Sequence, residues 1–379
     1  MPVNRQPSTV NRLKIGFDAK RVFNNRTGLG NYSRTLLDNL RRFQPDNDYV
    51  LFTPKVSENE FGEKYAQEFP TVTPDKMGGT YWRSYGVGKD IEKEGIEVFH
   101  GLSNELPFRL EGVKKVVTIH DLIFKRLPDT YPFLDRQVYD MKSRKSCRSA
   151  DVVIAISEST KRDIMHYYGI KEEKIKVIYQ ACDAIYYEDT PIDKSILEKY
   201  NLPENYLLSV GSVVERKNLL NTVKAISALP KSLQIPLVVV GKGKKYRQKV
   251  MSFLHSNRME SQVIWVENLH EIADLKQVYQ QASTLLYPSE YEGFGLPVVE
   301  GLLCKTPVIT SNISSLPEAA GDGALQINPH SVEEITGALE KLMSDSGFAA
   351  DLVERGYRHA RGKFDAEKLT GEVVGVYKS

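Results

Sequence analysis

The chain has 379 residues, of which 41% are hydrophobic and 26% are charged. This profile is typical of a soluble globular protein, and the length exceeds what one hydrophobic core normally organises, so we expect two domains. The formal net charge of only +2 argues against wholesale binding of nucleic acid.

Signals for membrane insertion, export or disulfide bonding are missing from the sequence. The N-terminal stretch MPVNRQPSTVNR is polar, and no run of about 18 uninterrupted apolar residues occurs. The cysteines Cys147, Cys182 and Cys304 lie far apart without C-x-x-C spacing. We therefore expect reduced thiols, no zinc site and a cytoplasmic protein.

Short apolar runs alternate with amphipathic segments along the chain. The runs LKIGF, YVLF, VFHG, KVVTIHD, DVVIAIS and KIKVIY are expected strands of a first series. A second series contains YLLSVG, LVVVGKG, VIWVENL, TLLYPS and TPVITS. This rhythm predicts an α/β protein with two doubly wound, Rossmann-like domains, each built on a mostly parallel sheet.

The periodicity lapses in CDAIYYEDTPIDKS, where acidic, tyrosine and proline residues gather. We place the domain boundary near residues 188 to 192. The expected parts are an N-terminal domain over residues 1–190, a C-terminal domain over 191–360, and a tail over 361–379 formed by a helix that crosses back to the first domain. Two such domains would face each other across a cleft at the carboxyl ends of their strands, where sheets of this kind bind ligands.

Two motifs follow strands of the first domain. RTGLGNYS brings Gly28 and Gly30 to a helix expected from Asn31, whose N–H groups would face an anion. A nicotinamide or flavin fingerprint would need a third glycine where Ser33 stands. A flexible turn capped by Asn31 is the alternative. In VVTIHDL, His120 can bond a sugar hydroxyl or act as acid or base, and a core or surface histidine is the alternative.

A basic pair follows the first strand of the second domain. SVVERKN contains Arg216 and Lys217, which suit a diphosphate because arginine binds it bidentately and lysine as a point charge. A solvated basic loop is the alternative. Gly211, in SVG, and Asn268, in VIWVENL, also follow strands, and we assign both to the same ligand site.

The stretch SEYEGFGLPVVEG holds Glu292 and Glu300 around a glycine turn. Pro297 suits the first helical position, which makes Leu296 a cap without a side-chain acceptor and leaves first-turn N–H groups for a ligand. Glu300 would lie one turn into this helix. Ser289 and Glu292 also match an S-x-x-E capping box, but the glycines that follow argue against a helix there. The stretch therefore predicts a ligand-binding turn.

Two further motifs are interpreted as structural. PDNDY contains Asp46 and Asp48 at the D-x-D spacing of metal-dependent sugar transferases, but Pro45 and the flanking elements favour a solvated turn. GVGKD lacks the glycine and the hydroxyl of a P-loop. We predict no metal site.

Together these motifs resemble the family 4 retaining glycosyltransferases, also called group 1 glycosyltransferases, of the bacterial polysaccharide type with the GT-B fold. The resemblance extends from KIGFDAK to GDGALQINP, and the pattern E-x7-E in EGFGLPVVE is its most specific part. RTGLGNYSRTLL, VIAISESTKRDI, KIKVIYQACD, ERKN and LPEAAGDGA add to it. One departure is Cys182, where many relatives have glycine.

The resemblance implies that the N-terminal domain is the acceptor side and that the C-terminal domain binds the nucleotide sugar. It also implies a role for each matched residue. Glu292 would contact the donor sugar, Glu300 the ribose, and the pair Arg216 and Lys217 the diphosphate. His120 would also meet the donor sugar. The remaining matched residues would lie along the donor: the backbone of Phe294, Gly295 and Leu296, and the loop Gly28 to Gly30 beside the phosphates and the acceptor.

The implied reaction moves a hexose, with GDP-mannose as our preferred donor, to a glycan or lipid-linked glycan of a cell-surface polysaccharide. Its leaving group is an anionic nucleotide, which two cations and helix N-termini could neutralise without a metal. No cofactor is implied, because the nucleotide diphosphate sugar is a co-substrate. We expect retention through same-face attack. A double displacement would need an opposite-face carboxylate, for which Glu292 is the one candidate.

Two alternatives remain: a sugar-nucleotide epimerase of the same two-domain shape, and a non-catalytic subunit that binds nucleotide sugars. A separate expectation concerns the basic cluster KSRKSCR. It could hold the enzyme at the cytoplasmic face of an anionic membrane, since each such cation contributes about 1 kcal/mol, and a solvated helix face is the alternative. Its cations are Lys142, Arg144, Lys145 and Arg148.

Overall fold

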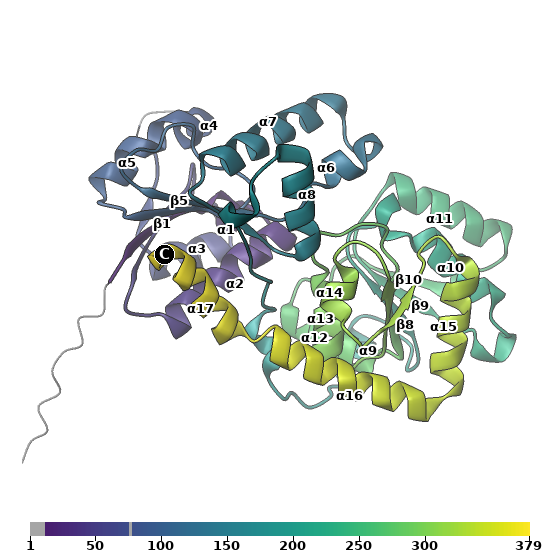
Figure 1. Cartoon of the computed structure of the whole chain (residues 1–379). Coiled ribbons are helices and arrows are strands. Elements are labelled where there is room, and N and C mark those ends of the chain that lie inside the picture. The colour runs from purple at the N-terminus through teal and green to yellow at the C-terminus, as the bar shows by residue number, and fades with distance from the viewer. Residues whose placement is uncertain (1–11, 76–77) are drawn as a thin grey trace, which may run out of the picture. The chain divides into compact units, whose positions relative to one another are not determined.

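Figure 1 shows the computed structural model, which describes residues 12–75 and 78–379. The contacts within the chain divide it into two units. Unit 1 contains the described residues up to 156 together with 160–178 and 367–379, and unit 2 contains 157–159 and 179–366. The predicted α/β class with two doubly wound parallel sheets is confirmed.

A seven-stranded sheet forms the centre of unit 1, in the order β3-β2-β1-β4-β5-β6-β7. Every neighbouring pair is parallel. Its inner strands are apolar runs buried on both faces, as a parallel sheet covered by helices requires. The strands are β1 (Lys14–Asp18), β2 (Asp48–Phe52), β3 (Thr71–Val72), β4 (Val98–Gly101), β5 (Lys114–Ile119), β6 (Val152–Ala155) and β7 (Ile175–Val177).

Helices connect these strands. The two longest are α2 (Gly28–Phe43) and α7 (Phe133–Ser149), and a short π-helical turn spans Trp82–Gly86. The other helices are α1 (Lys20–Asn24), α3 (Glu60–Glu68), α4 (Gly79–Tyr81), α5 (Val87–Lys93), α6 (Ile123–Arg126) and α8 (Glu158–Tyr168), whose first two residues count with unit 2.

The C-terminal helix α17 (Ala366–Lys378) belongs to unit 1 from its second residue on, and its yellow ribbon appears there in Figure 1. A buried polar chain holds it: Tyr377 OH bonds His100 Nδ1 at 2.7 Å, and His100 Nε2 bonds Thr118 Oγ1 at 2.8 Å. Lys114 Nζ donates to the Val376 carbonyl at 2.7 Å, where a cation complements the helix C-terminus.

Unit 2 has a six-stranded, fully parallel sheet in the order β10-β9-β8-β11-β12-β13. Its strands β9, β11 and β12 are buried along their whole length. The strands are β8 (Leu207–Val210), β9 (Leu237–Val240), β10 (Val263–Val266), β11 (Thr284–Tyr287), β12 (Val308–Ser311) and β13 (Leu325–Ile327).

Eight α-helices of the described chain accompany this sheet. They are α9 (Ser195–Lys199), α10 (Leu219–Ala228), α11 (Lys245–Ser256), α12 (Ile272–Gln281), α13 (Leu296–Leu303), α14 (Leu316–Ala320), α15 (Val332–Ser344) and α16 (Ser346–Lys363).

The segment expected as a linker is instead packed on unit 2. Lys276 Nζ, from α12, donates to the carbonyls of Ile185 and Glu188 at 2.6 Å each, and Tyr186 is 3% exposed. The change of unit therefore falls at residue 178 rather than near 190. At the other end, α16 continues to Lys363 and the buried Phe364 packs on Phe294 with ring centroids 5.2 Å apart, so the tail begins later than residue 361.

Each sheet has one point at which the strand order reverses. In unit 1 it lies between β1 and β4, and in unit 2 between β8 and β11. Doubly wound sheets bind ligands beyond the carboxyl ends of the strands at such a point. Clusters of charged residues lie at both.

Candidate active site

Arg216 and Lys217 end a 3-10 turn, Glu215–Lys217, in the connection from β8 to α10. Arg216 Nη1 donates to Glu292 Oε1 at 2.6 Å, and Lys217 Nζ lies 2.6 Å from the same oxygen. The main chain fixes this approach, because Glu290 N donates to the Arg216 carbonyl at 2.8 Å. We call Arg216, Lys217 and Glu292 the unit 2 charge cluster.

The unit 2 charge cluster is largely withdrawn from solvent. The side chains of Arg216, Lys217 and Glu292 are 22%, 15% and 10% exposed. Burial raises the pKa of the Glu292 carboxyl, but Lys217 and Arg216 lower it more, so the pKa lies below its usual range. Two cations share one carboxylate, and the cluster keeps one net positive charge that favours an anionic ligand.

Gly211 and Tyr287 complete the surroundings of Lys217. Gly211 follows β8 with φ of 129°, and an added Cβ there would lie 3.6 Å from Lys217 Nζ. Lys217 Nζ also donates to the Tyr287 hydroxyl and lies 4.3 Å from the centroid of that ring. Both residues line one small pocket with Lys217. Tyr287 was not among the sequence predictions, because the end of a buried apolar strand gives no signal for a polar role.

The glycine turn before α13 differs in detail from the sequence prediction. Gly295, with φ of 115°, is the N-cap, and Leu296 is the first helical residue. The predicted cap at Leu296 is therefore wrong by one position, because only glycine adopts this left-handed backbone without strain. The N–H groups of Val298 and Val299 donate to the Gly295 carbonyl at 2.9 and 3.4 Å, so they are not reserved for a ligand.

Glu300 lies on α13, one turn into the helix. Its Oε2 accepts a 2.8 Å hydrogen bond from the hydroxyl of Tyr279, on α12. Burial raises the pKa of Glu300 to about 7, and the Tyr279 hydrogen bond opposes part of this rise. Glu292 and Glu300 therefore differ in charge state near neutral pH, although one stretch supplies both.

Three other residues considered in the sequence analysis, Phe294, Asn268 and Ser289, are not members of the unit 2 charge cluster. The Phe294 side chain is 2% exposed and packs on Tyr179 and Phe364, so it can meet a ligand only through its backbone. Asn268 is exposed and follows β10, the outer strand of the sheet, two strands away from β8. No helix begins at Ser289, and Glu292 forms ion pairs instead of a capping box.

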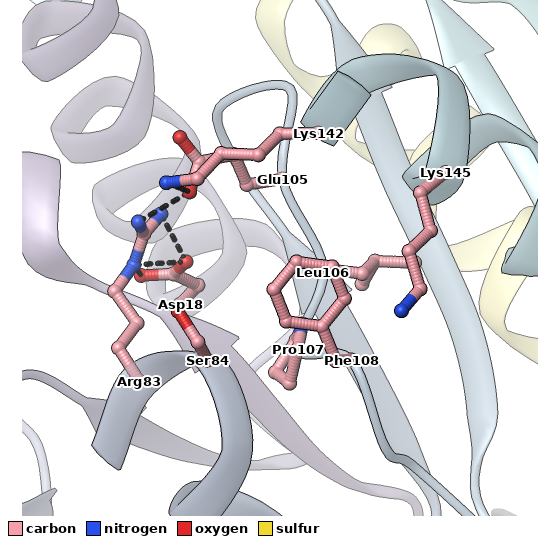
Figure 2. A pocket seen from close by; sticks show the side chains of 9 residues that line it. All are labelled: Asp18, Arg83, Ser84, Glu105, Leu106, Pro107, Phe108, Lys142 and Lys145. Atoms are coloured by element: carbon pink, nitrogen blue, oxygen red, sulfur yellow. Dashed lines mark hydrogen bonds and ion pairs between the residues drawn. The ribbon is translucent and has the colours of Figure 1, made fainter. Parts of the chain in front are cut away.

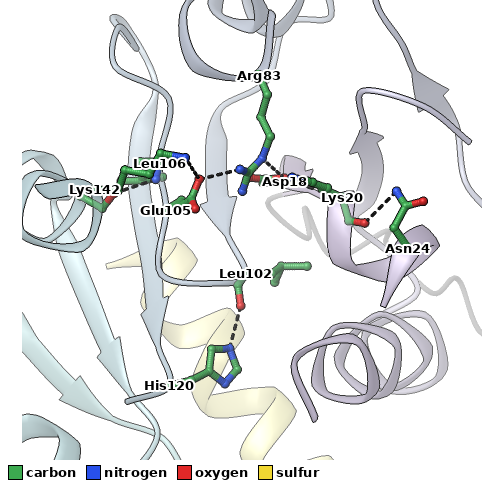
Figure 3. Close-up of polar contacts among 10 residues, drawn as sticks. Asp18, Lys20, Asn24, Arg83, Leu102, Glu105, Leu106, His120 and Lys142 are labelled. Atoms are coloured by element: carbon green, nitrogen blue, oxygen red, sulfur yellow. Dashed lines mark hydrogen bonds and ion pairs between the residues drawn. The ribbon is translucent and has the colours of Figure 1, made fainter. Parts of the chain in front are cut away.

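His120 of unit 1 follows β5 and is 5% exposed. Its Nε2 lies 2.8 Å from the Leu102 carbonyl (Figure 3), which makes Nε2 the donor and Nδ1 the acceptor of a neutral ring. Burial lowers the pKa of His120 to about 4. The neutral ring can take part in a hydrogen bond with a hydroxyl, but so low a pKa makes it a weak base and leaves it unprotonated, so it is not an acid near neutral pH.

The predicted glycine loop of unit 1 is the first turn of α2. This helix begins at Gly28, not at Asn31, and Thr27 precedes it. Asn25 Oδ1 accepts from the N–H groups of Thr27 and Gly30 at 2.8 and 3.1 Å, which explains the earlier start. Gly28 is exposed, whereas a Cβ on Gly30 would lie 1.9 Å from the Asn25 carbonyl oxygen.

A second group of charged residues lies at the strand reversal of unit 1 (Figures 2 and 3). The sequence predictions named only Lys142 of this group, and only as a cation of the basic cluster. Arg83 is within 2.6 Å of Asp18 and 2.5 Å of Glu105, and Lys142 Nζ donates to Glu105 at 3.3 Å. Burial lowers the pKa of the Arg83 guanidinium, but the Asp18 and Glu105 carboxylates raise it more. We call these four residues the unit 1 charge cluster. No motif spacing connects them, since each comes from a different segment.

The two aspartates of the D-x-D candidate lie in a turn and at the start of a strand. Asp46 is exposed in a turn, and Asp48 begins β2 and pairs with Arg12. Within residues 12–75 and 78–379, no three His, Cys, Asp or Glu side chains are grouped so that they could hold a metal ion. None of the helices in this described part is both long and apolar enough to span a bilayer.

Comparison with known families covers both units. The family described as Glycosyltransferase Family 4 matches residues 26–184, and Glycosyl transferases group 1 matches residues 193–359. The chain is also 30% identical over 288 residues to the O-antigen chain mannosyltransferase B of Escherichia coli, a match that covers 74% of each chain. The chain belongs to glycosyltransferase family 4.

Within this family, the similarity to longer proteins is partial. The serotype-specific mannosyltransferase WbdA of Escherichia coli is 30% identical over 272 residues, which cover 67% of this chain but only 32% of WbdA. This family 4 chain thus corresponds to about a third of that relative.

Solved structures confirm the GT-B fold expected for a family 4 glycosyltransferase. HepE of Anabaena, crystallised with UDP and glucose, aligns with a TM-score of 0.73 over 97% of this chain and 100% of HepE. The sequence identity is 18%, so this likeness concerns the fold alone.

Proposed function

We propose that the protein is a retaining, metal-independent glycosyltransferase that moves a hexose from a nucleotide diphosphate sugar to a glycan or lipid-linked glycan in polysaccharide synthesis. Mannose is the proposed sugar and GDP-mannose the proposed donor. The unit 2 charge cluster at the reversal between β8 and β11 is the observation that carries this proposal. The mannosyltransferase names of the relatives support the choice of sugar.

The unit 2 charge cluster suits the departure of a nucleoside diphosphate. Arg216 and Lys217 hold one Glu292 oxygen at 2.6 Å each, and negative charge that develops on the leaving phosphate could draw on the same two cations. Such preorganised charge in a site of low exposure is a strong source of transition-state stabilisation. Glu292 would then interact with the donor sugar as that sugar becomes positively charged.

The residues supporting nucleotide recognition lie close to this cluster in the chain. Glu300 is proposed to accept hydrogen bonds from the ribose hydroxyls. The backbone of Gly295 and of Gly211 is proposed to lie against the phosphates. In unit 1, His120 is proposed to contact the donor sugar and the start of α2 the phosphates or acceptor. Asn268 keeps its proposed place in donor binding, at the outer strand.

A donor panel tests this proposal. The purified protein is incubated with GDP-mannose and other nucleotide sugars, with and without cell lipid extract, and released nucleoside diphosphate is measured. We expect release that depends on the extract and persists in excess EDTA. Conversion of the donor to another nucleotide sugar without extract would identify the epimerase. Binding without any turnover would identify the non-catalytic subunit.

We also propose that α7 contacts an anionic membrane at the cytoplasmic face. One side of this helix carries exposed apolar residues near its start, Leu134 at 75%, Val138 at 45% and Met141 at 54%, and at helical spacing they lead to Lys145 and Arg148. Exposed apolar side chains beside cations can enter the headgroup region of an anionic membrane. Lys142 turns away to Glu105, so the surface proposed for membrane contact consists of these five residues.

A further inference from the structure

Tyr287 is the last residue of β11, and its side chain contacts Lys217 in two ways. The Lys217 ammonium lies 4.3 Å from the centroid of the tyrosine ring, and Nζ donates a hydrogen bond to the tyrosine hydroxyl. A cation gains from both contacts, because the ring face carries partial negative charge and the hydroxyl oxygen is an acceptor. One side chain therefore holds the ammonium through its ring and its hydroxyl.

The strand gives Tyr287 a fixed position. β11 lies inside the unit 2 sheet, where it pairs with β8 and β12, and Tyr287 is 3% exposed. Its carbonyl accepts from Thr310 Oγ1 at 3.0 Å. Lys217, by contrast, ends a 3-10 turn and has a long, flexible side chain. The tyrosine is thus the rigid member of the pair, and it can set where the ammonium lies.

The Tyr287 hydroxyl lies between the opposite charges of Lys217 and Glu292. Burial, the Glu292 carboxylate and a hydrogen bond to that carboxylate raise the pKa of Tyr287 well above its ordinary value, so the hydroxyl keeps its proton. Its oxygen accepts from Lys217. A phenylalanine would fill the same apolar space without either bond. The hydroxyl therefore contributes to the arrangement of charges and not only to core packing.

The contacts of Lys217 leave it able to bind a phosphate. An ammonium has three N–H donors. Glu292 Oε1, 2.6 Å from Nζ, and the Tyr287 hydroxyl engage two of them, so the third can meet a phosphate oxygen of the donor. Gly211 lines the same small pocket and adds no side chain beside the ammonium. Charge that is fixed in advance needs no reorganisation as the leaving group becomes negative.

We infer that Tyr287 is a positioning residue of the transferase, which holds the Lys217 ammonium where the leaving diphosphate becomes negatively charged. This inference rests on the proposed function. Tyr287 acts through Lys217 and does not itself touch the donor. Loss of its hydroxyl should therefore alter Lys217 and leave the fold intact.

The variant Tyr287→Phe tests this role in turnover. GDP release from GDP-mannose is measured with cell lipid extract as the source of acceptor. The kcat should fall about 10-fold, equivalent to about 1.4 kcal/mol, because a less well placed ammonium stabilises the transition state less. The KM for GDP-mannose should stay at the wild-type value, since Arg216 and the charge of Lys217 are retained.

The Lys217 amine provides a second readout that does not need turnover. The free protein is labelled with acetic anhydride at increasing pH, and acylation of Lys217 is quantified by mass spectrometry. Burial already lowers the pKa of Lys217, and Glu292 opposes this effect. Without the hydroxyl the buried ammonium loses an acceptor, so the pH of half-maximal labelling should be about one pH unit lower. The charged groups that act on Lys217, namely Glu292, Arg216 and Glu300, are the same in both proteins.

Tyr65→Phe is the matched control. Tyr65, in α3 of unit 1, is 2% exposed. Its hydroxyl donates to Asp38 Oδ2 at 2.8 Å, and Lys64 Nζ donates to the same oxygen at 3.1 Å. The control loses a buried hydroxyl from a similar group of lysine, tyrosine and carboxylate. It should resemble Tyr287→Phe in melting temperature but keep the wild-type kcat and Lys217 labelling.

Three outcomes separate the possibilities. A wild-type kcat in Tyr287→Phe would overturn the inference. A lower kcat with unchanged Lys217 labelling would also overturn it, because the tyrosine would then not act through the lysine. A wild-type protein that releases no GDP and transfers no sugar would overturn the proposed function instead, and the labelling would still show whether Tyr287 holds Lys217.

Discussion

Glu292 and Glu300 lie in one short stretch but have opposite electrostatic surroundings. Arg216 and Lys217 hold Glu292 at 2.6 Å each and keep its pKa low. In the described chain, the Glu300 carboxyl accepts a hydrogen bond from the Tyr279 hydroxyl and forms no ion pair. Burial raises its pKa to about 7. The two carboxylates should therefore contribute to different parts of the reaction.

Replacing each glutamate with glutamine should separate these contributions. Glu300→Gln should weaken binding of donor and free nucleotide alike, because the ribose barely changes as the glycosyl bond breaks. Above pH 7, where Glu300 is ionised, a lost charge-assisted hydrogen bond of about 1.5 to 3 kcal/mol corresponds to about 10-fold to 150-fold in affinity. Glu292→Gln should lower kcat while the free nucleotide still binds normally. Calorimetry with the nucleoside diphosphate and turnover of the donor measure both effects.

The assignments would be wrong if Glu292→Gln lost nucleotide affinity as severely as Glu300→Gln, or kept the wild-type kcat. Variants that lowered only the melting temperature would indicate that the stretch has a structural role alone.

The raised pKa of Glu300 also predicts a pH dependence of stability. Since the folded state holds this proton up to about pH 7 and the unfolded state only to its ordinary value of 4.5, the contribution of Glu300 to the free energy of unfolding is largest below 4.5. It falls as the pH rises through 7. Urea denaturation between about pH 5 and pH 8 should show this fall in the wild type relative to Glu300→Gln. A constant difference between the two proteins would contradict the raised pKa.

At the scale of elements, the start of α2 offers a matched pair of glycines. Gly30→Ala places a Cβ 1.9 Å from the Asn25 carbonyl and should destabilise the fold by about 1 to 3 kcal/mol. The Cβ added by Gly28→Ala has no atom within 4 Å, so this variant should keep the wild-type melting temperature. Its turnover should fall, because the added methyl group would stand where the ligand approaches the turn. Thermal unfolding and turnover of both variants measure this. Full activity of Gly28→Ala would show that the turn is structural only.

Helix α7 makes a second prediction at this scale. The double variant Leu134→Ser/Val138→Ser should reduce co-sedimentation with anionic vesicles, because it removes exposed apolar area that would enter the interface. Ile192→Ser is the control, since Ile192 is an apolar residue of unit 2 that is 59% exposed. Equal sedimentation of the wild type with anionic and neutral vesicles would rule out this contact.

At the scale of the whole molecule, repeated patterns made the fold predictable. Alternating apolar runs and amphipathic segments correspond to the two parallel sheets, because strands buried on both faces must be apolar. The domain boundary was harder to predict. The polar segment after β7 resembles a linker, yet Lys276, far along the chain, binds its carbonyls and fixes it to unit 2.

The two charge clusters also differ in whether the sequence alone could predict them. Arg216, Lys217 and Glu292 stand in recognisable motifs, and the structure brings them together. Asp18, Arg83, Glu105 and Lys142 come from four segments without any common pattern. Only folding unites them, and the π-helical turn that aims Arg83 depends on tertiary contacts of Trp82 and Ser84.

The most direct test of the central claim is the configuration of the product. The protein is incubated with isotopically labelled GDP-α-mannose and a mannosyl acceptor, and the anomeric signal of the new linkage is recorded by NMR. We predict a new α-linked mannose on the acceptor, formed with GDP release. A β-linked product would contradict the retaining mechanism, and a spectrum containing only a changed nucleotide sugar, or only the starting donor, would contradict glycosyl transfer itself.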